Sequence, residues 1–342
     1  PSRRPRTRRA RARLQRSGLA GVSRAVLAFS ALILLGAPVS AGFFPKSPFS
    51  DAAAGTTGAV FLRIPSGARG EALGGANSAS AEGAEALFWN PGGLGRLAGG
   101  GRAEATLSYN ALLESSYAGA LGYARPLANG RSVWAAGLVY HSAGEVEGYD
   151  RFGNSAGSFS PTDLALSGAY AHRFELFSAG AALKLVRSEI AGESGMTFAT
   201  DLGVSAERVS AIGEGPVDFG ASLRNLGPGI QVGSAADPLP MAIQFGARWH
   251  VSPVMAMMLD GYMPVDADPY PALGGEFTQP FGAASKGQLR FGYNINRQRG
   301  IDGLTGLTGG GGLDLDRMRI DYAWVPFGEL GTSHKMTLAF KF

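Results

Sequence analysis

The strongest constraint in this sequence is a two-residue alternation of apolar and polar side chains that recurs over most of its length. Segment 243–250 reads IQFGARWH, which puts Ile, Phe, Ala and Trp on one face and Gln, Gly, Arg and His on the other. Segments 217–224, 289–296 and 317–324 alternate in the same way. Because successive side chains of a β-strand point to opposite faces, this period predicts strands with one apolar and one polar face.

Two architectures share this pattern, and the polar faces help to separate them. A soluble sandwich turns its apolar faces inward, whereas a transmembrane barrel turns them outward to lipid. The polar faces here are rich in small residues and single charges, which suits a crowded lumen better than a solvated surface. Aromatic residues also lie near the predicted strand ends, where interfacial girdles occur: Tyr109, Tyr140, Tyr170, Trp249, Tyr293 and Trp324.

The end of the chain supports the barrel interpretation. The last nine residues, HKMTLAFKF, alternate and finish on a terminal phenylalanine. We interpret Phe340 and Phe342 as the signal that the barrel-assembly machinery of the outer membrane reads. The sequence therefore predicts an all-β, transmembrane antiparallel β-barrel in the bacterial outer membrane.

The number of alternating segments predicts the size of the barrel. We count fourteen between 103–112 and 333–342, among them 131–142, 162–173, 197–207, 216–226 and 304–315. Fourteen is an even number, as expected for a bacterial barrel, and twelve or sixteen stay open. The chain has no cysteine, although exported proteins often depend on disulfides. A closed barrel offers another source of stability, because every backbone group within the membrane finds a partner.

Residues 1–41 are expected to form a signal peptide. Nine arginines within residues 1–24 precede an apolar run at 25–37, and small residues follow up to Ala41, where cleavage fits. The run is shorter than the roughly 20 residues of a membrane anchor, the alternative interpretation. The long basic stretch favours a true start nearer Val22 or Val26. Without the leader, 22 basic residues face 27 acidic ones, so we expect no nucleic-acid partner.

Residues 42–102 do not alternate, and we expect them to form a plug inside the barrel of residues 103–342. The string ALFWNPGGL places a bulky aromatic directly before residues that stop regular structure. Asn90 precedes a proline and two glycines follow it, so a helix predicted over 80–89 should end at Trp89. The apolar end of this helix then needs a pocket, and the barrel interior is the nearest large enclosed volume.

Two strings in this segment carry a resemblance to a known family. FLRIPSGARGEALGGA (Phe61–Ala76) followed by WNPGGL (Trp89–Leu94) resembles the PorV/PorQ family of outer-membrane proteins, relatives of the FadL-type fatty-acid transporters. Segments 224–230, 239–249, 289–294 and 319–340 also resemble the later strands of that family. The resemblance implies a fourteen-stranded, FadL-like barrel with its N-terminal segment inside. It makes the following residues plug or lumen candidates: Arg63, Arg69, Gly74, Gly75, Leu87, Phe88, Trp89, Asn90 and Pro91.

The sequence departs from the family pattern at three points. Leu73 stands where the family usually has methionine, and Gly92-Gly93 replaces an Ala-Gly pair. Ala81-Glu82-Gly83 replaces an acidic pair, which puts in doubt any ligand or partner role tied to that pair.

The polar faces of the predicted strands should point into the lumen. The candidates for lumen-facing polar residues are Arg224, Arg248, Arg290, Arg319 and Asp321. Their mixed signs suggest pairs with one another or with charges of the plug, since unpaired charges in a tight lumen are costly. A solute-selective lining is the alternative.

Three functions fit a barrel of this kind. The first is uptake or passage of hydrophobic small molecules, as the FadL resemblance implies, with Leu87, Phe88 and Trp89 against the solute. The second, implied by the PorV resemblance, is a type IX secretion barrel that receives cargo proteins and passes them to a surface complex. Loops 144–161 and 300–312 are the candidate docking loops. A general porin is less favoured, because fourteen strands leave too few residues for a long constriction loop.

Catalytic motifs in the sequence lack the context that their chemistry needs. Ser155 lies in GNSAG, but a nucleophile elbow requires a strand before it and a helix after it. The four histidines are far apart and show no metal-ligand spacing. We therefore expect no enzyme, no cofactor and no metal, with lipid of the outer membrane as the surroundings.

Overall fold

The computed structural model describes residues 43–282, 284–298 and 302–342. The predicted signal peptide lies outside the described residues. Among the described residues, no helix is long and apolar enough to cross a membrane.

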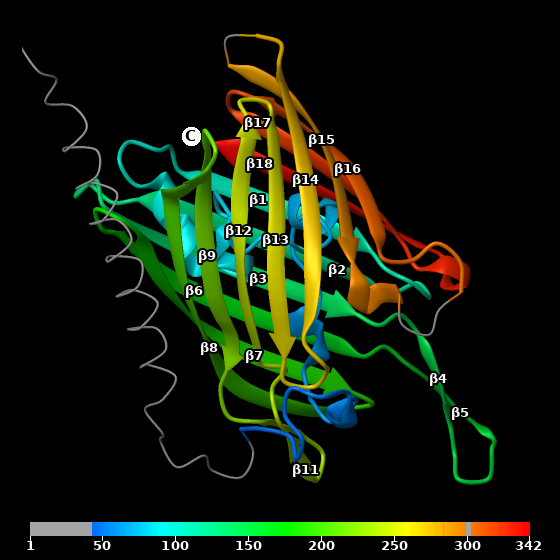
Figure 1. Cartoon of the computed structure of the whole chain (residues 1–342). Coiled ribbons are helices and arrows are strands. Elements are labelled where there is room, and N and C mark those ends of the chain that lie inside the picture. The colour runs from blue at the N-terminus through cyan, green and yellow to red at the C-terminus, as the bar shows by residue number, and fades with distance from the viewer. Residues whose placement is uncertain (1–42, 283, 299–301) are drawn as a thin grey trace, which may run out of the picture.

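The described strands form one closed barrel of fourteen antiparallel strands (Figure 1), as the alternation predicted. Neighbouring strands are consecutive in the chain apart from two inserted hairpins, and pairing of the first strand with the last closes the barrel. The barrel strands are β1 Glu104–Ala111, β2 Tyr117–Pro126, β3 Ser132–Ser142, β6 Thr162–Arg173, β7 Ser178–Ile190, β8 Glu193–Ile212, β9 Gly215–Leu226, β12 Ala242–Ser252, β13 Met255–Pro264, β14 Tyr270–Pro280, β15 Ser285–Asn294, β16 Leu307–Leu315, β17 Met318–Pro326 and β18 Thr332–Lys341.

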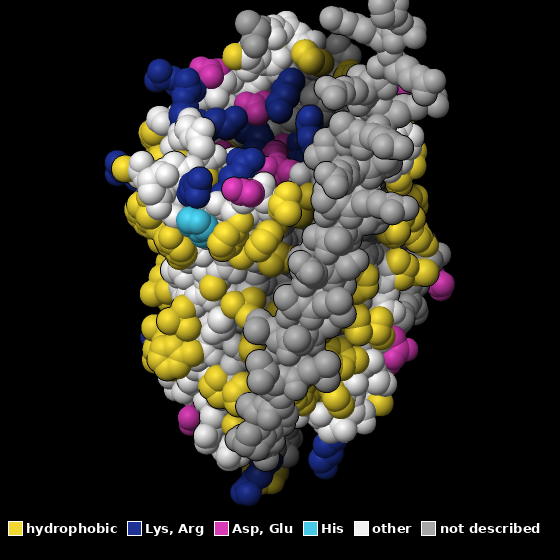
Figure 2. Space-filling model, turned by 60° about the vertical axis from the view of Figure 1, so that its left-hand side comes forward, with side chains coloured by type: hydrophobic (Ala, Val, Ile, Leu, Met, Phe, Trp, Pro, Cys, Tyr) yellow, Lys and Arg dark blue, Asp and Glu magenta, His cyan; other side chains and the backbone are white. Residues whose placement is uncertain are grey.

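The apolar faces of the strands point outward. Phe245, Leu289 and Met336 are each more than half exposed on the outer surface, while their neighbours in sequence are buried or half-buried. Figure 2 shows hydrophobic side chains spread over the body of the barrel and charged side chains gathered at its upper end. This distribution is that of a barrel with lipid as its solvent.

Aromatic side chains mark both borders of this apolar band. Near one end, Tyr117 stacks against Tyr109 and lies beside Tyr140, with ring centroids 6.2 and 6.0 Å apart. Near the other end, Tyr123 and Trp134 pack with centroids 5.3 Å apart. Two such girdles are typical of the two interfaces of a membrane.

The two ends of the barrel differ in their connections. Short turns, such as 127–131 and 253–254, join the strands at the end where the chain terminates, which we call the short-turn end. The opposite, long-loop end carries two hairpins: β4 Val146–Tyr149 with β5 Ser155–Phe159, and β10 Ile230–Val232 with β11 Ala235–Asp237. Neither hairpin was predicted.

The N-terminal segment lies in the lumen and is coiled into short helices. These are η1 Asp51–Ala53, η2 Val60–Arg63, α2 Ala68–Ala72, α3 Ala86–Trp89 and η3 Pro91–Leu97, while η4 Ile295–Gln298 and η5 Gly328–Leu330 lie at the long-loop end. The helix predicted over 80–89 ends at Trp89 as expected, but it is one turn long. Gly83, at φ 64°, adopts a left-handed conformation that interrupts it.

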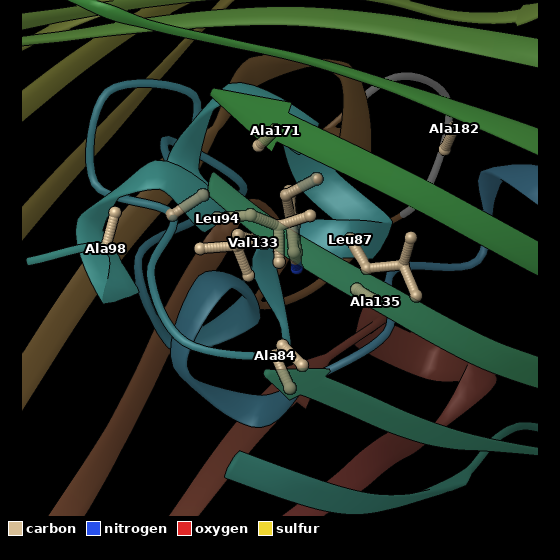
Figure 3. Packing of buried hydrophobic residues seen from close by; sticks show 12 residues of the cluster. Ala84, Leu87, Leu94, Ala98, Val133, Ala135, Ala171 and Ala182 are labelled. Atoms are coloured by element: carbon tan, nitrogen blue, oxygen red, sulfur yellow. The ribbon is translucent and has the colours of Figure 1, made fainter. Parts of the chain in front are cut away.

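The core of the molecule is the contact between plug and wall. In the cluster of Figure 3, Leu87 and Leu94 of the plug pack against Val133, Ala135 and residues of β6 and β7. Glycines of the wall bring the two backbones together. At Gly292, for example, a Cβ atom would collide with Leu73 and Gly74 of the plug.

One predicted docking loop is corrected by this fold. The glycines at 309–312 belong to β16 and lie in the barrel wall, so 300–312 is not a loop over its whole length. A Cβ atom on Gly310 would collide with the side chain of Ala72 in the plug. Glycine at this position of the wall therefore lets the plug approach closely. The strand expected at 304–315 overlaps that loop, and the structure agrees with the strand.

Candidate functional site

The lumen contains a cavity of about 480 Å³ between the plug and the wall at the long-loop end. Its volume falls in the range of small-molecule sites in proteins. Apolar and aromatic side chains form much of its lining: Phe61, Ile64, Trp89, Tyr262, Tyr270 and Phe327.

A β-bulge lies directly beside Arg224, a polar residue of the cavity lining. The pairing of β8 with β9 shifts so that Arg224 and Asn225 together oppose Asp201. Asn225 has a φ of 59°, and its side chain is buried like that of Arg224 although the two are adjacent in sequence. A bulge of this kind redirects a side chain that regular alternation would have pointed to the opposite face.

The Arg224 side chain is buried without a carboxylate partner. Its guanidinium donates to the carbonyl oxygen of Phe88 and to the hydroxyl of Tyr262, both at 3.2 Å. It also lies 5.9 Å from the ring centroid of Trp89. Its Nε has no hydrogen-bond partner, and Arg224 forms no ion pair with a carboxylate in the described part of the chain. This leaves a cation that is only 7% exposed and has no counter-charge beside it.

The nearby carboxylate of Asp201 does not neutralise Arg224. Lys184 lies 2.7 Å from Asp201 and donates to the side-chain oxygen of Asn225 at 2.5 Å. The backbone N–H of Asn225 donates to Asp201 at 2.7 Å. Asp201 is therefore already paired with a buried lysine, so the charge of Arg224 stays uncompensated.

A second group of charges lies on the opposite side of the cavity. Glu71 of α2 accepts from Arg297 at 2.7 Å and from Lys335 at 2.9 Å. Burial opposes ionisation of this carboxyl, but the two cations outweigh it and hold the pKa of Glu71 below its usual value. Two cations thus share one carboxylate at the cavity wall.

The charged lining is positive as a whole. The described lining holds four cationic side chains and one carboxylate: Arg63, Arg224, Arg297, Lys335 and Glu71. Arg63 has a partner outside the lining, Asp266, at 2.7 Å. A cavity with apolar walls and an excess of positive charge is suited to a hydrophobic molecule with an anionic group.

The other predicted lumen-facing residues are ion-paired in an internal network. Glu276 is shared by Arg69 at 3.0 Å, Arg290 at 2.8 Å and Arg248 at 3.2 Å. Asp321 lies 2.6 Å from Arg290 and 2.9 Å from Arg319. All five predicted lumen residues point inward, but only Arg224 reaches the cavity.

The predicted plug candidates are spread over several positions. Trp89 and Arg63 line the cavity, and so does Gly75, whose carbonyl oxygen accepts from Gln244 at 2.8 Å. Gly74 and Pro91 lie against the backbone of the wall, and the Asn90 side chain bonds to it. Leu87 and Phe88 pack over Gly137 of β3 rather than lining the 480 Å³ cavity. Phe340 and Phe342, the predicted assembly signal, are exposed on the outer surface at the end of β18.

Several cavity residues had no signal in the sequence. Tyr262, Arg297 and Lys335 come from three different strands or loops, and no motif connects them. Lys335 could have been found from the alternation of the last strand, which places it on the lumen face. Ser155, the candidate nucleophile, starts the exposed strand β5, and no helix follows it. Among the described residues, no cluster of three potential metal-ligating side chains occurs.

A closed barrel of fourteen strands, with an apolar outer face and an N-terminal plug, defines an outer-membrane β-barrel protein. Within that class the chain belongs to the PorV family: the family described as "Type IX secretion system protein PorV" matches residues 48–251. This confirms the resemblance inferred from the plug strings. No curated protein is similar enough to the chain to be called a relative.

Solved structures share the fold at low sequence identity. The toluene transporter TbuX of Ralstonia pickettii superposes with a TM-score of 0.54 at 14% identity, covering 82% of this chain and 100% of that one. The toluene transporter TodX of Pseudomonas putida gives 0.55 at 12% identity, with 82% and 99% covered. The monoaromatic hydrocarbon channel CymD gives 0.52 at 12% identity, with 82% and 98% covered. The family and these structures are barrel proteins rather than enzymes.

Proposed function

We propose that this barrel takes up or passes hydrophobic small molecules that carry an anionic group, and that the 480 Å³ cavity is their binding site. The observation that carries the proposal is the uncompensated Arg224 in an apolar cavity. Burial of a cation without a counter-ion is unfavourable, so a carboxylate or similar group of a ligand would stabilise it. TbuX and TodX are toluene transporters and CymD is a monoaromatic hydrocarbon channel, which supports the passage of hydrophobic molecules in this proposal.

The cavity walls support the apolar part of this assignment. Trp89 and Tyr262 flank the guanidinium of Arg224, while Phe61 and Ile64 continue the lining. In this proposal the anionic group of the ligand contacts the guanidinium of Arg224 beside the two aromatic rings, and the apolar part of the ligand lies along the plug. In the orientation usual for such barrels, with short turns on the periplasmic side, the cavity faces the cell exterior.

Ligand binding can be tested with purified protein in detergent that lacks an anionic head group. A dansyl-labelled fatty acid serves as the fluorescent probe, with laurate and dodecanol as competitors. We expect laurate to displace the probe far better than dodecanol, because only laurate carries a carboxylate. Arg224→Gln should weaken probe binding by about 10- to 100-fold, the equivalent of ~1.5–3 kcal/mol for a hydrogen bond to a charged group.

The matched control replaces an arginine on the outer surface. Arg187 is exposed, paired with Glu189 at 2.8 Å, and is not part of the cavity lining. Arg187→Gln should leave probe binding unchanged. Equal displacement by laurate and dodecanol, or equal loss in both variants, would contradict an anion-reading role for Arg224.

A second function is favoured by family membership together with one surface feature. The β4–β5 hairpin projects from the long-loop end (Figure 1), and its tip exposes Phe152. We propose, as the alternative, that the hairpin receives cargo proteins of a type IX secretion system. Replacement of residues 146–159 by a Gly-Ser turn should then abolish cargo export in the source cell while leaving probe binding intact.

A further inference from the structure

The long-loop end of the cavity is covered by one stretch of the N-terminal segment. Residues 51–66, which we call the strap, precede the tightly packed part of the plug and contain η1 and η2. Val60, Phe61, Arg63, Ile64 and Pro65 of the strap line the cavity. A molecule entering from this end would therefore meet the strap first.

One short loop between β13 and β14 holds the strap through polar contacts. The carboxylate of Asp266 accepts from the hydroxyl of Thr57 at 2.6 Å on one oxygen and from Arg63 at 2.7 Å on the other. Asp51 and Asp268 exchange hydrogen bonds between backbone N–H and side chain, at 3.1 and 2.8 Å. Asp266 is only 3% exposed, so a single buried carboxylate joins two strap residues that are six positions apart.

Elsewhere the strap has one apolar anchor, Phe61, which packs against Ile230 and Leu239, and few other buried residues. Only Ala53, Phe61 and Ser66 are buried among its sixteen residues, whereas most residues from Gly67 to Gly95 are buried. Segments with few buried contacts open at lower free energy than the core they are attached to. At the junction, Gly67 has a φ of 97°, which gives the chain a turn between strap and plug core.

We propose that the strap is a hinged lid over the long-loop end of the cavity and that Asp266 is its latch. This inference rests on the proposed ligand site, because the lid admits whatever the cavity binds. When the bonds from Thr57 and Arg63 to Asp266 break, the strap swings about the Ser66–Gly67 junction while the plug core stays in place. The plug core remains fixed by backbone contacts with the wall, such as that between Gly92 and Val204.

The first test measures access to the cavity without any ligand. The chain has no cysteine, so an introduced Ala272→Cys is the single thiol; Ala272 lines the cavity and is 3% exposed. Its reaction rate with a water-soluble maleimide reports lid opening. Adding Asp266→Asn, which weakens the latch, should raise this rate at least tenfold.

The matched control Asp316→Asn removes the partner of Arg102 at the short-turn end and should leave the rate unchanged. An unchanged rate with Asp266→Asn overturns the lid.

The second test locks the lid. The double variant Asp51→Cys with Asp268→Cys joins the strap to the β13–β14 loop through a disulfide. It leaves Asp266 and its bonds to Thr57 and Arg63 unchanged. Oxidation should slow association of the dansyl fatty acid at least tenfold, and reduction should restore the rate. The single variants Asp51→Cys and Asp268→Cys cannot form this disulfide and should bind the probe at the unaltered rate under the same oxidation. Equal association rates for the oxidised and the reduced double variant would overturn the lid.

The two proposals fail in different ways. If the probe binds with unchanged kinetics to the locked protein, the lid is wrong and the ligand site stands. If the probe does not bind at all, the ligand site is wrong, and the maleimide rates still decide whether the strap opens.

Discussion

Asn90 of the plug and Val204 of the barrel wall are joined by a 2.8 Å hydrogen bond from the Asn90 side-chain nitrogen to the Val204 carbonyl oxygen. The same nitrogen donates to the carbonyl oxygen of Ser78 at 2.8 Å, and the side-chain oxygen accepts from Gly92 at 3.0 Å. One fully buried amide thus connects the plug, its own turn and the wall.

Asn90→Ala should loosen the plug in the lumen. It removes three buried hydrogen bonds and leaves two carbonyl oxygens and one N–H without partners, so we expect a loss of about 2–4 kcal/mol. Urea unfolding followed by tryptophan fluorescence measures it. Asn154→Ala in the exposed β4–β5 hairpin is the control and should change stability by less than ~1 kcal/mol. Equal midpoints for the two variants would show that Asn90 does not anchor the plug.

Gly203→Leu should force the plug away from the wall. A Cβ atom on Gly203 would lie 2.8 Å from the backbone nitrogen of Gly92 and 2.9 Å from Pro91, so a larger side chain has no room. We expect the barrel to form with a displaced plug and a raised ion conductance in a planar bilayer. Gly168→Leu, on the outer face with nothing within 4 Å, should conduct as the unaltered protein does. The interpretation fails if both variants conduct alike.

Removal of the Glu276 charge should be strongly destabilising. Glu276→Gln takes away the counter-charge that Arg69, Arg248 and Arg290 share in the lumen. Loss of one partner from a buried ion pair leaves an uncompensated charge and costs about 3–5 kcal/mol. Asp314→Asn is the comparison, because its lysine partners Lys286 and Lys341 are partly exposed and can be solvated. We expect the urea midpoint to fall much further for Glu276→Gln than for Asp314→Asn.

The stability of the plug should depend on pH through Glu85. Burial, together with the carboxylates of Asp321 and Glu104, raises the pKa of Glu85 to about 7 in spite of Arg319 nearby. The unfolded chain has the ordinary value of 4.5. The folded protein therefore binds more protons than the unfolded chain between these values, and stability falls as the pH rises from about 4.5 to about 7.

Glu85→Gln removes this dependence, since an amide imitates the protonated carboxyl. The variant should match the unaltered protein at pH 5 and exceed it at pH 8, by on the order of 1–3 kcal/mol. Glu71→Gln gives the opposite sign, because Arg297 and Lys335 favour the ionised form of Glu71. It should destabilise the protein at pH 8. Parallel stability–pH curves for Glu85→Gln and the unaltered protein would rule out a role for this carboxyl.

The strand pattern could be predicted because it depends on local alternation alone. The segments expected at 162–173 and 131–142 agree with β6 and β3 to within one residue at each end. Strand β8, expected at 197–207, was less well predicted. β8 runs to Ile212, five residues past the expected end, because its register shifts near Arg208 produce an extension that no alternation signals.

The candidate site was only partly predictable. Alternation placed Arg224 inward, and the plug strings pointed to Trp89, but nothing in the sequence indicated that the two meet across the cavity. The contact of Arg224 with Tyr262 joins β9 to β13, and its contact with Trp89 joins the wall to the plug, so both depend on how these elements are arranged in space. The ion-pair partners were equally hidden, since Glu276 and Arg69 are separated by 207 positions.

The sequence by itself determined a closed barrel with lipid outside and charges inside, because a period of two fixes the face on which each side chain lies. Only the tertiary structure decided which charges neutralise one another and which one is left over. Ion pairing acts over a few ångströms between residues far apart in the chain, so it depends on how the plug fills the lumen. In the folded protein Arg290 pairs with two carboxylates, those of Glu276 and Asp321, whereas Arg224 in the same lumen pairs with none.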